Sequence, residues 1–250
     1  ISRENLEKSY LDSMYVISHS KNTVKSYKTR IHLFREFLQE NYQIDEYDLL
    51  DSLNEKKLDI FKIFKEFVIY LDKTGRSPRT IRLALSVNKG YLRSMGVKID
   101  SEDLKQIVKV PKVVKIREMP LDKEIISRLL RNAKPKLQVV ILVAVSSGMR
   151  IGEIVQLKIS DVDFTANPVK VYLRGETTKT RESRECFLTS EASNALRDYL
   201  KRYHGWFEGI KDPNILDKHI FSTVYRHRGP FIADSIIKTL QTELRELVRA

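Results

Sequence analysis

Apolar residues recur at intervals of three and four positions through the first part of the chain, the spacing that places side chains on one face of an α-helix. The clearest stripe consists of Val24, Tyr27, Ile31, Phe34 and Leu38. Ser20 and the pair Ser77-Pro78 are helix-start signals, while Gly75 and Gly96 are stop signals. The pattern predicts an all-helical unit over residues 1–104, with helices at 3–17, 20–41, 58–73 and 78–95.

A different organisation follows. Residues 105–120 are basic, contain Pro111 and Pro120 and lack periodicity, so we interpret them as a linker. A second unit is expected over residues 121–250. Its predicted helices are 122–131, 137–147, 151–157, 190–203 and 232–249. Its predicted strands are 159–164, 169–173 and 184–188, with a polar hairpin at 175–182 and a loop at 205–218. The expected fold class is mainly α with a small antiparallel β-sheet (α+β).

Composition narrows the function classes. The 250 residues include 45 Lys and Arg against 33 Asp and Glu, a net charge of +12. The longest apolar run, Val139 to Val145, is far shorter than a membrane span, and no apolar signal core opens the chain. The single Cys186 excludes an intramolecular disulfide and a multi-cysteine zinc site. We expect a cytoplasmic protein with an acidic polymer as partner. A start without Met and an end inside a helical pattern are consistent with a fragment.

The positive charge is concentrated in segments without acidic residues, namely 13–35, 73–99 and 104–117. Within the two helical segments, the cations recur at helical spacing beside the apolar stripes. One such face consists of Lys21, Lys25, Lys28, His32 and Arg35, and the other of Arg79, Arg82, Ser86, Lys89 and Arg93. Each could be an ordinary solvated face. Two of them together favour phosphate binding, so our candidate DNA-binding residues here are Lys21, Lys25, Lys28, Arg79, Arg82, Lys89 and Arg93.

The segment from Ser147 to Ile154 places Arg150 between a very apolar helix and the start of the next helix. A planar guanidinium at such a junction could grip a phosphate at two points, with Glu153, one turn later, orienting it. The alternative is an Arg–Glu pair that only closes the junction.

The predicted hairpin carries Lys179 near its tip, flanked by hydroxyl groups and by Arg181 and Arg184. A lysine there could enter a groove and donate a proton to a leaving oxygen, and the two arginines are further candidates for DNA binding. The alternative is a solvated turn.

In this order, the segments resemble the tyrosine recombinases, the phage- and archaeal-type site-specific integrases. Ser147 to Ile154 fits the family's first arginine motif, and Thr178-Lys179-Thr180 resembles its catalytic-lysine hairpin. His219 to Ser222 with Gly229-Pro230 resembles the stretch leading to its second motif. The resemblance implies a SAM-like helical core-binding domain over 1–104 and the N-terminal part of a catalytic domain over 121–250.

The family chemistry so implied is DNA strand exchange. A tyrosine attacks a backbone phosphate to form a 3′-phosphotyrosyl bond, without cofactor or metal. Carried over, Arg150 would clamp the phosphate, Glu153 would support it, and Lys179 would be the general acid for the 5′-oxygen. The implied partners are double-stranded DNA and further copies of the protein, in a tetramer.

One departure is large: the family's His-x-x-Arg motif and nucleophilic tyrosine are expected after the last predicted helix. His227-Arg228 lies too early and has the wrong spacing. Tyr203 and Tyr225 also lie too early and are interpreted as packing or loop residues, Trp206 as a packing residue and Cys186 as a small buried one.

Our leading hypothesis is therefore a site-specific DNA recombinase of which this stretch alone does not cleave DNA. The alternatives are a non-catalytic DNA-binding protein or regulator derived from an integrase, and a helical scaffold that binds an acidic protein.

Overall fold

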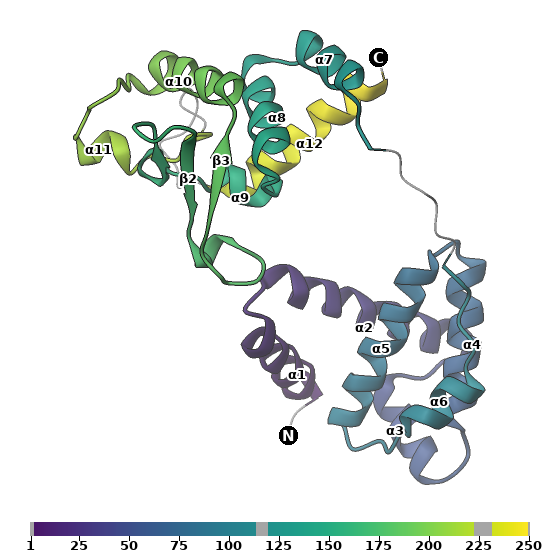
Figure 1. Ribbon diagram of the computed structural model, residues 1–250. Coiled ribbons are helices and arrows are strands. Elements are labelled where there is room, and N and C mark those ends of the chain that lie inside the picture. The colour runs from purple at the N-terminus through teal and green to yellow at the C-terminus, as the bar shows by residue number, and fades with distance from the viewer. Residues whose placement is uncertain (1–2, 114–119, 223–231, 250) are drawn as a thin grey trace. The chain divides into compact units, whose positions relative to one another are not determined.

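The computed structural model describes residues 3–113, 120–222 and 232–249, and the chain divides into two compact units, residues 1–117 and 118–250 (Figure 1). The first unit is helical throughout its described part. Its elements are α1 (Arg3–Ser18), α2 (Lys21–Tyr42), α3 (Glu46–Asn54), α4 (Ile60–Lys73), α5 (Pro78–Ser94) and α6 (Ser101–Ile107).

Aromatic rings from α2 and α4 form the centre of the first unit. Phe34 and Phe37 of α2 meet Phe67 of α4 with ring centroids 5.1 and 5.2 Å apart, and all three are almost completely buried. The predicted stripe on α2 does face this core through Ile31, Phe34 and Leu38. The predicted start signals also function, because Ser20 and Ser77 accept hydrogen bonds from the amides of Thr23 and Thr80.

Two helices of this unit were not predicted. Asp45 begins α3 with a capping box completed by Asp48, in a stretch whose many charges resemble a loop. Asp100 begins α6, whose Leu104 is buried, as is the following Val108. The apolar contacts of the first core thus continue past residue 104, into the segment interpreted as a linker.

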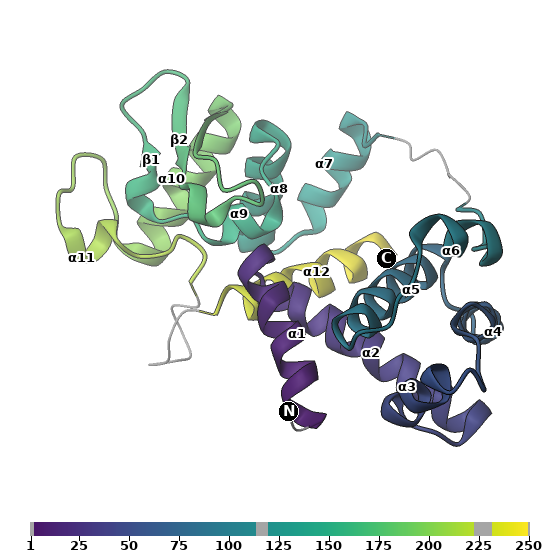
Figure 2. The same ribbon diagram turned by 90° about the horizontal axis from the view of Figure 1, so that it is seen from below.

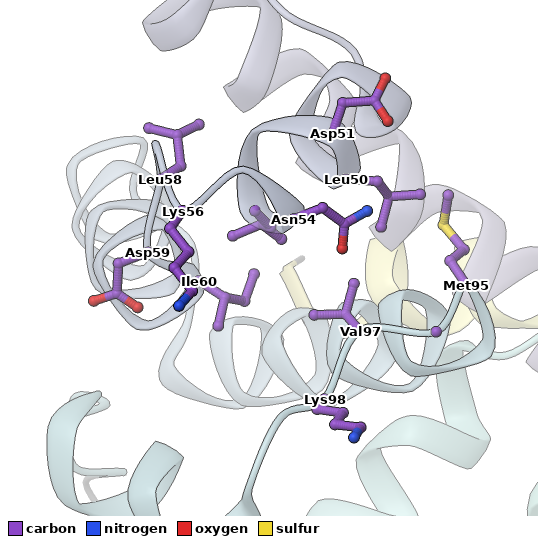
Figure 3. A pocket seen from close by; sticks show the side chains of 12 residues that line it. Leu50, Asp51, Asn54, Lys56, Leu58, Asp59, Ile60, Met95, Val97 and Lys98 are labelled. Atoms are coloured by element: carbon purple, nitrogen blue, oxygen red, sulfur yellow. The ribbon is translucent and has the colours of Figure 1, made fainter.

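A pocket of about 710 Å³ opens on the first unit where the end of α3, the start of α4 and the end of α5 meet (Figure 3). Leu50, Leu58 and Val97 provide part of its apolar lining. The charged side chains at its edge have both signs, since Asp59 lies there with Lys98. The pocket therefore has no marked preference for a cation or an anion.

The second unit combines helices with one small sheet. Its helices are α7 (Lys123–Asn132), α8 (Pro135–Ser147), α9 (Ile151–Val155), α10 (Ser190–His204), α11 (Pro213–Leu216) and α12 (Ala233–Arg249). The strands β1 (Val162–Asp163), β2 (Val169–Leu173) and β3 (Arg184–Leu188) form an antiparallel sheet in the order β1-β2-β3. The predicted α+β class is confirmed.

One face of the sheet is buried. Val171 of β2 pairs with Cys186 of β3 and both side chains are buried, as are Leu173 and Leu188. The helices α8 and α10 pack against each other (Figure 2) and against β3, which Figure 1 labels. The helix α12 packs against α7, α8 and α9 through Ile236 and Leu240. In the described part of the chain, no helix is both long and apolar enough to cross a membrane.

Three sequence predictions for this unit need correction. The first half of the strand expected at 159–164 is a 3₁₀ turn, Ile159–Asp161, because the Asp161 carboxylate accepts a 2.8 Å hydrogen bond from the Lys158 amide and bends the chain. The helix expected to reach residue 157 ends at Val155. The loop expected at 205–218 contains the short helix α11, which Asp212 caps.

Candidate functional site

Arg150 stands at the start of α9. Gly148 ends α8 with a left-handed backbone (φ +67°), which turns the chain so that Met149 is buried and Arg150 lies outside. Arg150 occupies the N-cap position of α9, where Ser or Asp is usual. Glu153, the third residue of the helix, accepts a 2.8 Å hydrogen bond at its Oε2 from the Arg150 amide and so satisfies one backbone donor at the helix start.

The side chains of Arg150 and Glu153 differ sharply in exposure. The Arg150 guanidinium donates through Nη1 to Glu153 Oε1 at 3.2 Å, yet its side chain is 58% exposed. The Glu153 side chain is only 2% exposed. The buried carboxylate therefore holds one edge of the guanidinium and leaves the rest toward solvent, where a phosphate oxygen could bind.

A second arginine reaches the same carboxylate from β3. Arg184 donates through Nη1 to Glu153 Oε1 at 3.2 Å and through Nη2 to Oε2 at 2.7 Å. Burial would raise the pKa of Glu153, but the hydrogen bonds from Arg184 and Arg150 outweigh it and hold that pKa below its usual value. Glu153 is thus ionised at neutral pH, and the three side chains carry a net charge of +1.

The hairpin between β2 and β3 is a closed loop. A 3₁₀ turn at Gly175–Thr177 leads to Thr178, whose buried hydroxyl lies 3.0 Å from the carbonyl oxygens of both Gly175 and Glu182. A Cβ at Gly175 would lie 2.7 Å from the Arg181 carbonyl oxygen, so the loop closes tightly only with glycine there. Lys179 follows Thr178 and is exposed. Among the described residues, no hydrogen bond or ion pair holds its ammonium group.

The basic helix faces of the first unit are only partly as expected. The side chains that are exposed include Lys21, Lys25, Lys28, Arg79, Arg82 and Arg93. Lys89 is half-buried and donates to the Ser101 hydroxyl at 3.3 Å, while Arg93 donates through Nε to the Ile99 carbonyl at 3.0 Å. These two cations thus also fasten the α5–α6 connection.

Arg35 does not belong to an open basic face. Its guanidinium forms ion pairs with Glu7 at 2.6 Å and with the buried Glu46 at 2.5 Å. These contacts join α2 to α1 and α3, so the charge of Arg35 is already neutralised inside the unit.

The segment 218–222, which was expected to lead toward the second motif, is fastened beside residues 157–159. The amide of Ile220 donates to the Leu157 carbonyl at 2.9 Å. His204 Nε2 lies 2.7 Å from the Ile220 carbonyl oxygen, and Lys136 Nζ donates to the Phe221 carbonyl at 2.7 Å. Burial lowers the pKa of both basic side chains. Tyr225, His227, Arg228 and the pair Gly229-Pro230 lie outside the described residues.

Packing roles expected for three other residues are confirmed. Trp206 is buried with its ring 4.5 Å from that of Phe164, and Cys186 is buried in β3. The Tyr203 ring packs against that of Tyr199 in a tilted arrangement, with ring centroids 4.7 Å apart, as expected of a packing residue.

Residues 119–222, which contain Arg150, Glu153, Lys179 and Arg184, match the sequence profile of the phage integrase family.

Curated relatives extend the likeness to the tyrosine recombinases. Tyrosine recombinase XerA of Pyrococcus furiosus is 25% identical over 186 residues, which is 73% of this chain and 56% of that protein. XerA of Saccharolobus solfataricus is 23% identical over 227 residues, covering 89% of this chain and 70% of the relative. The resemblance to tyrosine recombinases is confirmed, and the chain spans about half the length of the first relatives it matches.

Solved structures support the same fold. A lambda integrase tetramer bound to a Holliday junction has a TM-score of 0.65 at 14% identity, covering 99% of this chain and 66% of that one. A lambda integrase dimer (residues 75–356) bound to a COC′ core site has a TM-score of 0.64 at 14% identity. The match covers 99% of this chain and 82% of that one. At such identities the likeness concerns the fold alone.

The contact between Arg184 and Glu153 was not predicted from the sequence, in which Arg184 is a candidate for DNA binding only. The sequence signal for this contact is the alternation of inward and outward side chains along β3. Arg184, Cys186 and Leu188 share one face of the strand, and the last two are buried. A cation on the inward face of a strand needs a buried anion, and Glu153 is that anion.

Proposed function

We propose that this chain is the DNA-binding and phosphate-clamping part of a site-specific recombinase. Such a protein binds duplex DNA and, when complete, cleaves and rejoins strands through a 3′-phosphotyrosyl intermediate. The observation that supports this best is the exposed guanidinium of Arg150, held by the buried and ionised Glu153 inside the integrase-family segment.

Arg150 has the chemistry that this reaction needs. When a tyrosine oxygen attacks a phosphodiester, negative charge builds up on the non-bridging oxygens of phosphorus. A guanidinium fixed in advance stabilises that charge without having to reorganise during the reaction. Glu153 would supply this fixation, because it bonds both the amide and the side chain of Arg150.

Lys179 would act on the leaving group. As the bond between phosphorus and the 5′-oxygen breaks, the oxygen takes up a proton, and an exposed lysine on a groove-entering loop can donate it. Its unpaired state among the described residues leaves the ammonium available for this role.

The helical unit would bind the flanking DNA as a core-binding domain. Lys21, Lys25 and Lys28 on α2, with Arg79 and Arg82 on α5, would contact phosphates, and Arg181 would do so from the hairpin. Assembly as a tetramer on two duplexes is proposed from the family resemblance.

Residues 1–250 would bind DNA without cleaving it. By the family resemblance, we expect the His-x-x-Arg motif and the nucleophilic tyrosine after α12, so Arg150, Glu153 and Lys179 would act here without a nucleophile. We expect a gel-shift complex but no covalent protein–DNA adduct after denaturing electrophoresis. An adduct formed by the pure chain would contradict this assignment.

Salt dependence tests the DNA-binding part. The affinity for a duplex should fall log-linearly with salt, with a slope of about −0.9 for each phosphate contacted. The variant Arg150→Gln should weaken binding and reduce that slope. Affinity insensitive to salt would overturn the proposal in favour of a scaffold that binds protein.

A further inference from the structure

We propose that Arg184 is a positioning residue, which neutralises and orients the buried carboxylate of Glu153 so that Arg150 is presented to phosphate with its charge available. This inference rests on the proposed role of Arg150. It reassigns Arg184, which the sequence suggested as a direct DNA contact.

The four hydrogen bonds at Glu153 divide evenly between the two arginines. Oε1 accepts one bond from Arg150 Nη1 and one from Arg184 Nη1, each at 3.2 Å. Oε2 accepts one from the Arg150 amide at 2.8 Å and one from Arg184 Nη2 at 2.7 Å. Arg184 thus makes the two-point contact that fixes the plane of a carboxylate, whereas Arg150 binds this carboxylate through only one guanidinium nitrogen.

The exposures of the two arginine side chains agree with this division. Arg184 is 36% exposed and directs both terminal nitrogens inward, whereas Arg150 is 58% exposed. Of the two, Arg150 therefore has more guanidinium surface open to a phosphate, and Arg184 has both terminal nitrogens bonded to Glu153.

Charge explains why a second arginine is needed. A buried carboxylate with Arg150 as its sole cationic partner would form a neutral pair, and would draw the whole guanidinium toward itself. Arg184 supplies a second positive charge, so the cluster keeps a net charge of +1. The attraction that Arg150 can offer to a phosphate is then restored.

The contact also joins two parts of the site that lie 31 residues apart in sequence. Arg184 is the first residue of β3 and is paired with the buried Leu173 of β2, so its backbone is fixed by the sheet. The same strand follows directly on the hairpin that carries Lys179. One ion pair thereby fastens the base of the hairpin to the start of α9.

A double-mutant cycle on the whole 250-residue chain tests this proposal. Affinity for a fluorescent duplex of arbitrary sequence would be measured for Arg150→Gln, Arg184→Gln and the double variant, with Lys170→Gln as control. Lys170 lies on β2 and is paired with Glu185. Its substitution by Gln therefore removes the same charge from the same sheet. Unfolding curves would establish that each variant is folded.

If Arg184 acts through Arg150, each single variant loses affinity, by about tenfold for Arg150→Gln. The double variant then binds no more weakly than Arg150→Gln alone, with the same salt slope. Additive losses and a further decrease of about 0.9 in the slope would overturn the proposal, because they indicate a direct phosphate contact by Arg184.

A second readout separates this inference from the proposed function. In carbon-13 NMR titrations assigned with Glu153→Gln, the pKa of Glu153 should rise in Arg184→Gln and stay unchanged in Lys170→Gln. An unchanged pKa in Arg184→Gln overturns the positioning role even where Arg150→Gln weakens binding. If Arg150→Gln leaves affinity and salt slope intact, the proposed function itself fails.

The variant Arg184→Lys covers the case in which Arg184→Gln does not fold. Lysine keeps the charge but cannot span both carboxylate oxygens. A positioning role therefore predicts weakened DNA binding in Arg184→Lys that disappears in the Arg150→Gln background. Binding equal to that of the unmodified chain would contradict it, since charge alone would then suffice.

Discussion

Lys136 donates a 2.7 Å hydrogen bond from its ammonium group to the backbone carbonyl of Phe221, 85 residues later in the chain. The contact ties the start of α8 to the segment that follows α11. Because Lys136 is largely shielded from water, burial lowers its pKa, and the bond is formed in a poorly solvated place.

The variant Lys136→Met should lower the free energy of unfolding by about 1–3 kcal/mol. Methionine keeps much of the apolar stem but leaves the Phe221 carbonyl without its donor. Urea denaturation followed by circular dichroism measures the change. Lys134→Met is the matched control, because Lys134 is an exposed residue whose ion pair with Glu243 is screened by solvent. Equal losses in the two variants would refute a special role for Lys136.

The stability of the second unit should fall as the pH drops through about 6.5. Burial lowers the pKa of His204 and of His219 below the usual 6.5, although the hydrogen bond to Ile220 opposes this at His204. The unfolded chain therefore takes up protons first, which favours unfolding until the pH passes below the pKa of the folded state.

The variant His204→Gln should flatten this decline, since glutamine can still donate to the Ile220 carbonyl but does not titrate. Denaturation midpoints measured at a series of pH values provide the check. A slope as steep as that of the unmodified chain would assign the effect to other groups.

Removal of the carboxylate shared by two arginines should cost more stability than removal of an exposed one. Glu153→Gln leaves two guanidinium groups without their buried anion, so we expect a loss of about 3 kcal/mol. Glu185→Gln, in the exposed pair with Lys170, should cost less than about 1 kcal/mol. Chemical denaturation of both variants measures the loss of unfolding free energy. Similar losses in the two variants would contradict the buried-charge argument.

Cations on the two proposed basic faces should matter more for DNA binding than equally exposed cations elsewhere on the first unit. Replacing Arg79 and Arg82 together by Gln should reduce the salt slope of duplex binding by about 1.8, because two phosphate contacts are lost. Lys62→Gln with Lys65→Gln on α4 removes the same charge from exposed positions outside these faces. Fluorescence anisotropy across a salt series compares them, and equal slopes would mean that only net charge counts.

Much of the fold could be predicted because local patterns and tertiary packing agree. The apolar stripe of α2 faces the first core, and the alternation in β2 and β3 matches the buried face of the sheet. The missed helix α3 shows the opposite case. Its charged sequence resembles a loop, and its helical state depends on the Asp45 cap and on burial of Leu49 and Glu46 by neighbouring helices.

The candidate site could be predicted only as far as its components are neighbours in sequence. Arg150 and Glu153 are three residues apart, so helical geometry alone brings them together. The contributions of Arg184 and of Arg35 depend on partners from distant segments, which no single periodic pattern specifies.

The closed form of the β2–β3 hairpin has a consequence for how Lys179 works. The Thr178 hydroxyl bridges the Gly175 and Glu182 carbonyls directly before the lysine, so the backbone there is held in place. The distance over which the ammonium can search is set by the methylene groups of its own side chain. Substitution of Thr178 by Val keeps the shape of the side chain but removes the hydroxyl. The backbone at Lys179 would then be less fixed, and the ammonium group would search a larger volume with less defined direction.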